Sequence, residues 1–489
     1  MSMTLNANTN LDAKGALDGR RYRESLDDGR EVWLDGKRVE VTTHPAFQNT
    51  LDEFGRLYDL QWAPETRDLT TFESPDSGNR VSLSYLLPRT PDDLQAKRRN
   101  TDVWMQESWG QIGRAPDFMA NVAVGLYDYR NELEGNDPRF GQHAVDYHRF
   151  AQEHDLSITH AIGDPQVDRS ASPLDDPDLA LRIVGETDEG LVIRGAKQLA
   201  TLAPLAHEVL VYLSAAFALR ESEEFVLWFA LPMASPGLKI LCREPLGLHP
   251  NGHRHPFARR YDEQDAMLFF DDVVVPWNRV FLRGDGPLAL RGLGRINAWS
   301  LHSSHVRFYH RLRTYIGVSS MVARSIGVDA FRGIQEQLGE LVSYAEMVRL
   351  AMRGSEADAE ITTGGLLAPA RSMAIGIYAT QVSSRVVEIL RRIASSGMLM
   401  QPSEADLANP ELRPYLERYM HGKDIDVDRK SRLFRLAWDL AGDSSSSRQE
   451  LYEYLHRGDP TRTKMNMLRA YDLSDLEHRI DELISSPLP

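Results

Sequence analysis

The chain has 489 residues, of which 42% are hydrophobic and 26% charged, and its formal net charge is −15. This length exceeds what one hydrophobic core supports, so we expect more than one domain. The acidic balance argues against nucleic acid or an anionic membrane as a partner, because both require clustered Lys and Arg. The single cysteine, Cys242, excludes an intrachain disulfide and a Cys-based zinc site, and its apolar neighbours predict core packing.

The first third of the chain is predicted to be mainly helical. Residues 1–17 are polar and lack the basic start and apolar centre of a secretory signal. Asp35-Gly36 lies between alternating runs and indicates a hairpin. From Leu94 to His154 the apolar residues follow a helical period, so residues 1–155 are assigned to an N-terminal helical domain. No stretch reaches the roughly 20 apolar residues that span a bilayer, so we expect a cytoplasmic protein.

The period changes after residue 155 and changes back after Pro276. Short runs rich in β-branched and aromatic residues lie at 181–184, 191–194, 209–213, 225–231, 238–242 and 266–275. They predict a small barrel or sandwich, and residues 156–285 are assigned to a central β domain. Residues 286–489 are assigned to a C-terminal helical bundle, with one apolar stripe at Leu341, Ala345, Val348 and Met352. The predicted fold class is therefore α+β.

Several common catalytic motifs do not occur in the sequence. The nearest string to a dinucleotide-binding G-x-G-x-x-G, at 292–297, lacks the third glycine and follows no clear strand. There is no P-loop, no H-E-x-x-H and no G-x-S-x-G. The sequence therefore gives no sign of a nicotinamide-binding Rossmann domain, phosphoryl transfer, zinc hydrolysis or serine acylation.

Two segments place polar residues within apolar surroundings. In residues 113–119, Arg114 precedes Pro116 and Asp117, which fits a helix N-terminus with the Arg just outside it. This Arg could bind an anionic substrate or form a surface pair with Asp117. In residues 159–170, His160 is either a core histidine or a catalyst, while Gln166 and Arg169 could contact the polar edge or phosphates of a cofactor.

Two further segments offer candidate groups. Residues 195–201 close the predicted hairpin with small residues that let a flat ligand approach, and Thr201 adds a hydroxyl. His302 and His305 lie three apart and could share a helical face. The neighbourhood supplies no carboxylate partners, so we expect no metal and favour a general base.

Several strings in fixed order carry a family resemblance. They are Asp-Gly-Arg-Glu-Val-Trp-Leu-Asp-Gly at 28–36, Gly-Arg-Ala-Pro-Asp-Phe at 113–118, Pro-Gln-Val-Asp-Arg-Ser at 165–170, Phe-Asp-Asp-Val-Val-Val-Pro-Trp at 270–277, Leu-Ala-Trp-Asp at 436–439 and Glu-Leu-Tyr-Glu at 450–453. From about residue 20 to 460 the chain resembles the 4-hydroxyphenylacetate 3-monooxygenase oxygenase-component family, which includes chlorophenol monooxygenases. The resemblance implies an acyl-CoA dehydrogenase-like fold with a helical N-terminal domain, a central β-barrel and a C-terminal bundle. It also implies a homotetramer that uses FAD as FADH2 from a separate NAD(P)H:flavin reductase.

The resemblance also implies roles for individual residues. Arg114 and His160 match family residues that contact the phenolic substrate, and Phe118 stands where the family has Tyr. His302 looks like the base of the chlorophenol branch. The flavin contacts carry over to Gln166, Arg169 and Thr201, and to Arg448, which follows a run of four serines.

The implied activity is hydroxylation of a small phenol. O2 would react with FADH2 to give a C4a-hydroperoxide, and attack ortho to the phenolic oxygen would give a catechol. Two alternatives remain open on the sequence: a flavin-dependent oxidase or desaturase of the same fold, and a flavin-binding homologue without activity.

Overall fold

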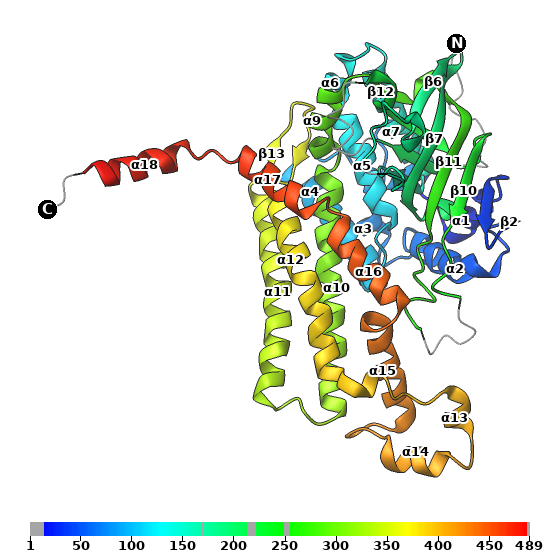
Figure 1. Cartoon of the computed structure of the whole chain (residues 1–489), viewed down its shortest axis with the longest axis vertical. Helices are drawn as coiled ribbons and strands as arrows, with labels where there is room; N and C mark the ends of the chain where they lie inside the picture. The colour runs from blue at the N-terminus through cyan, green and yellow to red at the C-terminus, as the bar shows by residue number, and fades with distance from the viewer. Residues whose placement is uncertain (1–13, 169, 213–221, 249–254, 487–489) are drawn as a thin grey trace.

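The computed structural model describes residues 14–168, 170–212, 222–248 and 255–486, which run from helices through strands to helices (Figure 1). The helices of the first part are α1 Gly19–Ser25, α2 Pro45–Asp59, α3 Arg67–Thr70, α4 Pro91–Glu107, α5 Pro116–Asp128, α6 Arg130–Glu134 and α7 Phe140–His154. Its strands are β1 Glu31–Leu34, β2 Lys37–Val39, β3 Thr71–Glu73 and β4 Arg80–Ser82. The helical character predicted for this part is confirmed, and β1 and β2 form the predicted hairpin.

The middle of the chain forms most of two sheets. Its strands are β5 Ile158–Ala161, β6 Arg182–Glu186, β7 Gly190–Thr201, β8 Glu208–Val211, β9 Leu227–Pro232, β10 Leu238–Cys242, β11 Asp265–Pro276 and β12 Val280–Arg283. One sheet has the order β2-β1-β10-β11-β7-β6 and the other β12-β9-β8-β5. The hairpin from the first part thus extends the larger sheet, with β1 parallel to β10. Cys242 ends β10 and is buried, as its apolar neighbours predict.

The predicted closure of these strands into a β-barrel is wrong. Within the described residues, the two sheets are open, and β5 and β12 form the edges of the smaller one. Helix α7 packs beside β12, and α5 contacts β5. Helices therefore lie at both edges of the smaller sheet, where a barrel would need further strands, and its inner strands β8 and β9 are buried along their whole length.

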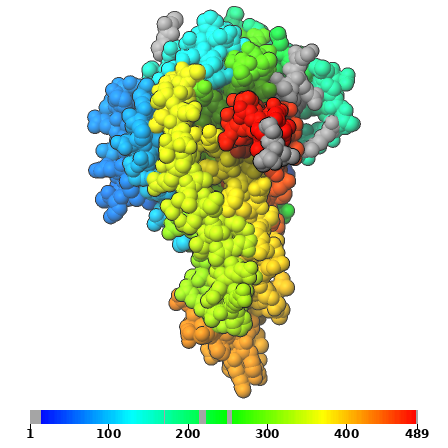
Figure 2. Space-filling view, turned by 90° about the vertical axis from the view of Figure 1, so that its left-hand side faces the viewer, coloured from blue at the N-terminus to red at the C-terminus, as the bar shows by residue number. Residues whose placement is uncertain are grey.

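The rest of the chain is a helical bundle with a C-terminal extension. Its helices are α9 Gly286–Ile296, α10 Ala298–Ser325, α11 Arg332–Ala357, α12 Ser372–Ala394, α13 Glu404–Ala408, α14 Arg413–Tyr419, α15 Val427–Ala441, α16 Ser444–Leu455, α17 Pro460–Ala470 and α18 Ser474–Ser485, with a short pair β13 Glu360–Ile361 and β14 Leu367–Ala368. The bundle narrows to a tip formed by α13 and α14 (Figure 2). The predicted apolar stripe on α11 is buried, as expected for a helix in the core of a bundle.

Helix α10 connects the two helical parts. It packs against α11 and α12 on one side and against α4 and α5 on the other. Helix α16 returns along α12 toward the sheets, and α18 then projects away from the body (Figure 1). The long helices of the described part carry too many polar residues for any of them to be a transmembrane span.

Candidate active site

Arg114 is a buried arginine without a carboxylate partner. It lies just before α5, which starts at Pro116, and only 6% of its surface is exposed. Its guanidinium donates to Tyr452 Oη at 2.8 Å and to His160 Nε2 at 2.7 Å. Within the described residues it forms no ion pair, and its Nε atom has no hydrogen-bond partner. A buried charge of this kind is costly, so the position is suited to an anion from outside the chain.

The carboxylate of Glu263 holds the backbone of this turn. It accepts the N–H of Gly113 at 2.8 Å and also the N–H of Arg114. The start of helix α5 is also fixed. The buried Asp117, three residues after Arg114, accepts the hydroxyls of Thr101 on α4 and Ser303 on α10. The guanidinium of Arg114 is therefore presented from a rigid backbone.

His160 is a neutral hydrogen-bond acceptor beside Arg114. It lies on β5, and its Nδ1 is 2.9 Å from the hydroxyl of Tyr212. Burial, together with the charge of Arg114, holds the pKa of His160 well below its usual range. The structure thus brings Arg114 and His160 together, as the family resemblance implies.

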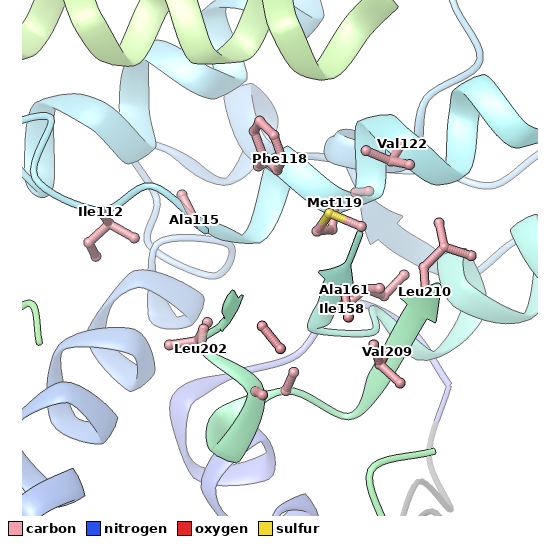
Figure 3. Close-up of a cluster of buried hydrophobic side chains, with 14 of the residues drawn as sticks. Ile112, Ala115, Phe118, Met119, Val122, Ile158, Ala161, Leu202, Val209 and Leu210 are labelled. Carbon is pink, nitrogen blue, oxygen red and sulfur yellow. The ribbon is translucent and has the colours of Figure 1, made fainter. Parts of the chain in front are cut away.

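Phe118 gives this polar pair an apolar neighbour. Its ring centre lies 4.5 Å from the guanidinium carbon of Arg114, and the ring meets His160 edge to face at 6.0 Å. Figure 3 shows Met119 directed toward Ile158 on β5, while the ring of Phe118 projects from another side of α5. Phe118 is 5% exposed, so it contributes a water-excluding surface but no hydroxyl.

Tyr452 on α16 covers the group and was not among the residues selected from the sequence. Its hydroxyl meets Arg114, and its ring stacks on His456 with centroids 4.3 Å apart. A Cβ atom on Gly113 would lie 2.5 Å from the Tyr452 ring, so the approach requires glycine there. The Glu-Leu-Tyr-Glu string marked this segment, but nothing local indicated that its tyrosine reaches Arg114.

The predicted flavin residues Thr201 and Arg448 meet at one carboxylate. Asp265, the first residue of β11, accepts the Thr201 hydroxyl at 2.7 Å and two bonds from Arg448 at 2.5 and 2.9 Å. Arg243 adds a further contact at 3.0 Å. Burial by itself would raise the pKa of Asp265, but the two arginines and the hydroxyl hold it below its usual range. The end of β7, the start of β11 and α16 are thereby joined.

The other two predicted flavin residues lie on the segment after β5. Gln166 is exposed, and Arg169 lies outside the described residues. The segment starts beside β7, where Gly163 pairs with Gln198. The pair of Asp164 with Lys197, at 2.6 Å, holds it there. The start of the segment is therefore fixed next to the strand that carries Thr201.

His302 lies on a different side of α10 from the Arg114 group. Its Nε2 is 3.2 Å from Glu356 on α11, although without hydrogen-bond geometry, and Arg98 on α4 contacts the same carboxylate at 2.8 Å. Other residues of α10 reach the group: Ser304 has its hydroxyl 2.8 Å from His456, and the guanidinium carbon of Arg307 lies 5.1 Å from the centre of the Tyr452 ring. Within the described residues, no hydrogen bond joins His302 to Arg114 or His160.

One group of side chains in the described part of the chain offers metal-ligand atoms close together. The ligand atoms of His255, Asp439 and Asp443 lie within 4.8 Å of one another. His255 contacts Asp443 at 2.8 Å, and Asp439 accepts the N–H groups of Phe257 and Ala258. Burial, and then repulsion from Asp443, raises the pKa of Asp439 to about 8. These bonds hold the segment starting at His255 against the turn between α15 and α16.

Comparisons with known proteins identify the family of the chain. Residues 18–282 match the family described as 4-hydroxyphenylacetate 3-hydroxylase N terminal, and residues 293–485 match its C-terminal counterpart. The chain belongs to the 4-hydroxyphenylacetate 3-hydroxylase family. The resemblance seen in the ordered sequence strings is thereby confirmed.

Relatives in this family match almost end to end. The 4-hydroxyphenylacetate 3-monooxygenase oxygenase component of Thermus thermophilus is 34% identical over 97% of this chain and 98% of its own length. The 4-nitrophenol 2-monooxygenase oxygenase component of a Rhodococcus species is 32% identical over 93% of this chain and 88% of its own. A crystal structure of a 4-hydroxyphenylacetate 3-monooxygenase oxygenase component with FAD and 4-hydroxyphenylacetate has a TM-score of 0.91 and 33% identity, covering 96% of this chain and 98% of that one.

The fold itself is shared more widely. Glutaryl-coenzyme A dehydrogenase superposes with a TM-score of 0.50 at 14% identity, over 89% of this chain and 96% of that one. At this identity the likeness concerns the fold alone. The protein therefore has an acyl-CoA dehydrogenase-like fold, as the resemblance implies, with open sheets between its helical parts.

Proposed function

We propose that the protein is the oxygenase component of a two-component flavin-dependent monooxygenase that hydroxylates a small phenol ortho to its hydroxyl. FADH2 would come from a separate NAD(P)H:flavin reductase, and O2 is the co-substrate. The observation that carries the proposal is the buried guanidinium of Arg114, which pairs with no carboxylate among the residues that the structure describes and lies beside the neutral acceptor His160 and the ring of Phe118. A phenol brings an aromatic ring, a proton to donate and an oxygen that becomes negative, and these three features match the three residues.

The residues around Arg114 also fit a reduced flavin close by. Among the described residues, Arg114 Nε is a buried donor without a hydrogen-bond partner. Thr201 and Arg448, for which the family resemblance implies flavin contacts, both donate to Asp265. We propose that Gln166, Arg169, Thr201 and Arg448 hold the FAD. The bound flavin would supply the oxygen-transfer chemistry with O2, which no side chain can perform.

The protein's own residues would then bind and activate the phenol. A phenol entering between Arg114 and His160 would replace the contact of Arg114 with Nε2 of His160. Nε2 could then accept the phenolic proton, which makes the ring more electron-rich, and Arg114 would stabilise the phenolate oxygen. Phe118 and Tyr452 would exclude water around the reacting ring. We favour His160 over His302 as the base, because only His160 contacts Arg114 within the described residues.

An oxidase or desaturase of the same fold would need a free carboxylate base at the substrate. The carboxylates described at the Arg114 turn and beside the predicted flavin residues are already engaged. Glu263 accepts two backbone N–H groups, and Asp265 accepts from Thr201 and two arginines. These contacts weigh against the oxidase and favour the monooxygenase.

The test measures catechol and H2O2 formed from a panel of phenols, with NADH and a flavin reductase supplying FADH2. Arg114→Ala is expected to lower the catechol yield about 10²-fold or more while H2O2 rises, since a buried charge contact and general-base help are both lost. Arg20→Ala, at an exposed i,i+4 pair with Glu24, is the matched control and should behave as the parent protein. Absence of catechol from every phenol, or equal coupling in both variants, would refute the proposal.

We further propose that the protein is a cytoplasmic homotetramer. Helices α17 and α18 bury none of their residues in the single chain, and they expose Leu468, Leu476, Ile480 and Leu483. Short isolated helices with an exposed apolar face are only marginally stable in water. We therefore propose that further copies of the chain cover α17 and α18, which supports a tetramer. A cytoplasmic location fits the need for reductant from NAD(P)H.

A further inference from the structure

The hydrogen bonds of His160 continue away from Arg114 through two residues that have no assigned role. Nδ1 of His160 is 2.9 Å from Tyr212 Oη, and Tyr212 Oη is 3.2 Å from Oδ1 of Asn297. Tyr212 lies just after β8, and Asn297 lies between α9 and α10. Both residues are set back from Arg114, so any effect they have on a substrate acts through His160.

The direction of each bond follows from the chemistry of the groups. Arginine only donates, so Nε2 of His160 must accept from Arg114. A neutral imidazole with Nε2 as acceptor carries its proton on Nδ1, which then donates to Tyr212. The Tyr212 hydroxyl has one proton and gives it to Asn297. The other atom of the Asn297 amide, Nδ2, donates to the carbonyl of Leu293 at 2.8 Å, which fixes the orientation of the amide.

We propose that Tyr212 and Asn297 are positioning residues that, together with Arg114, hold His160 in the Nδ1–H tautomer, so that Nε2 stays an acceptor and can bind the hydroxyl of an entering phenol. The importance of this tautomer for catalysis rests on the proposed function. In the opposite tautomer Nε2 would be a donor and could not take the phenolic proton. The site would then bind a phenol without activating it.

The surroundings of His160 leave few other influences on its protonation. Arg114 is the charged group that faces it, and Tyr212 is the titratable one. Burial raises the pKa of Tyr212 well above its usual range, so this hydroxyl keeps its proton at all ordinary pH values. The tautomer of His160 is therefore set by hydrogen bonds and not by a neighbouring carboxylate.

The first measurement needs no substrate. In ¹⁵N spectra of histidine-labelled protein, with the His160 signal assigned by its loss in His160→Gln, the parent protein is expected to show a protonated Nδ1 and a bare Nε2. In Arg114→Ala, where Tyr212 and Asn297 alone hold the ring, the Nδ1–H tautomer should persist. Adding Tyr212→Phe to Arg114→Ala should make the two tautomers mixed, because Nδ1–H then loses its acceptor. A parent protein with its proton on Nε2, or an unchanged tautomer in the double variant, would overturn the proposal.

The second measurement reads the effect on a bound phenol. The yellow phenolate band of enzyme-bound 4-nitrophenol is titrated against pH without flavin. One neutral hydrogen bond changes an equilibrium by up to about tenfold, so Tyr212→Phe and Asn297→Leu should raise the pKa of the bound phenol by up to about one unit. With FADH2, kcat for hydroxylation should fall by a similar factor while KM stays within about twofold. Asn297→Asp, which keeps the acceptor oxygen, should lose much less kcat than Asn297→Leu.

Tyr129→Phe is the matched control. Tyr129 is also buried, packs on Trp228 as Tyr212 does, and donates its hydroxyl to Leu288 in the same region. Tyr129→Phe is expected to leave both the pKa of the bound phenol and kcat unchanged. Equal behaviour of Tyr129→Phe and Tyr212→Phe would overturn the proposal. A parent protein that shows the expected tautomer but hydroxylates no phenol would instead refute the proposed function alone.

Discussion

Glu453 on α16 should contribute strongly to the docking of this helix, and Glu453→Gln tests that contribution. The carboxylate is 2% exposed and is shared by three buried arginines. Arg307 lies 2.7 Å from it, Arg457 3.4 Å and Arg311 3.5 Å. The substitution keeps the shape of the side chain but leaves three buried cations without their anion.

Two independent arguments give similar magnitudes. Burial alone would raise the pKa of Glu453, but the arginines lower it from 4.5 to about 2. At about 1.4 kcal/mol per pH unit, this difference corresponds to about 3 kcal/mol of stability. Removing one partner of a buried ion pair typically costs about 3–5 kcal/mol. Because the pKa is depressed, this stability is present above about pH 4.5 and is lost as the pH falls toward 2.

Hydrogen exchange measured along α16 is the suitable assay, because one global unfolding energy is not well defined for a chain of several parts. Protection of the α16 amides should fall about 10²-fold in Glu453→Gln at pH 7. Glu450→Gln, three residues earlier, removes a half-exposed contact with Arg391 at 3.4 Å and should cost less than about 1 kcal/mol. Equal protection in the two variants would show that the buried arginines do not need Glu453, and the reasoning would fail.

Three further changes are expected to have measurable effects. Gly113→Ala should displace Tyr452, whose ring lies 2.5 Å from the new Cβ, and lower the coupling of hydroxylation to O2 use, whereas Gly294→Ala, in open space, should not. Because the pKa of Asp439 is raised, the thermal midpoint of the protein should fall as the pH rises toward about 8. Asp439→Asn should make the thermal midpoint depend less on pH, and an unchanged dependence would contradict the raised pKa of Asp439. Ending the chain at Asp459 removes α17 and α18 and should lower the number of subunits per particle, which light scattering measures from the particle mass. A tetramer of the shortened chain would exclude these helices from the assembly.

The sequence predicted the elements better than their arrangement. Alternation and the Asp35-Gly36 pair predicted the first hairpin, and the helical period predicted α11, because these signals are local. The pairing of β1 with β10 joins residues about 200 positions apart, and no local pattern encodes it. The barrel prediction failed for the same reason, since only the packing of α5 and α7 shows that helices cover the sheet edges.

The sequence predicted those residues of the candidate site that lie in recognisable motifs or in polar segments within apolar surroundings. Arg114 and His160 were selected as polar residues within apolar surroundings and again by the family resemblance, and the structure joins them directly. Tyr212 and Tyr452 look like ordinary core aromatics in sequence, so only their contacts show that they belong to the group. His302 is buried on α10. The sequence does not show which side of α10 faces Arg114, because that depends on the helices packed around α10.

The contact between Arg114 and Tyr452 spans 338 positions of the chain, and this separation has a consequence for biosynthesis. At about 5–20 residues per second, a ribosome needs roughly 20–70 s between adding these two residues. During that time the nascent chain already carries Arg114, His160 and Tyr212 but lacks the helix that covers them. An unfinished or prematurely terminated polypeptide would therefore leave these residues uncovered, and the exclusion of water that we propose for Tyr452 would begin only when translation has nearly ended.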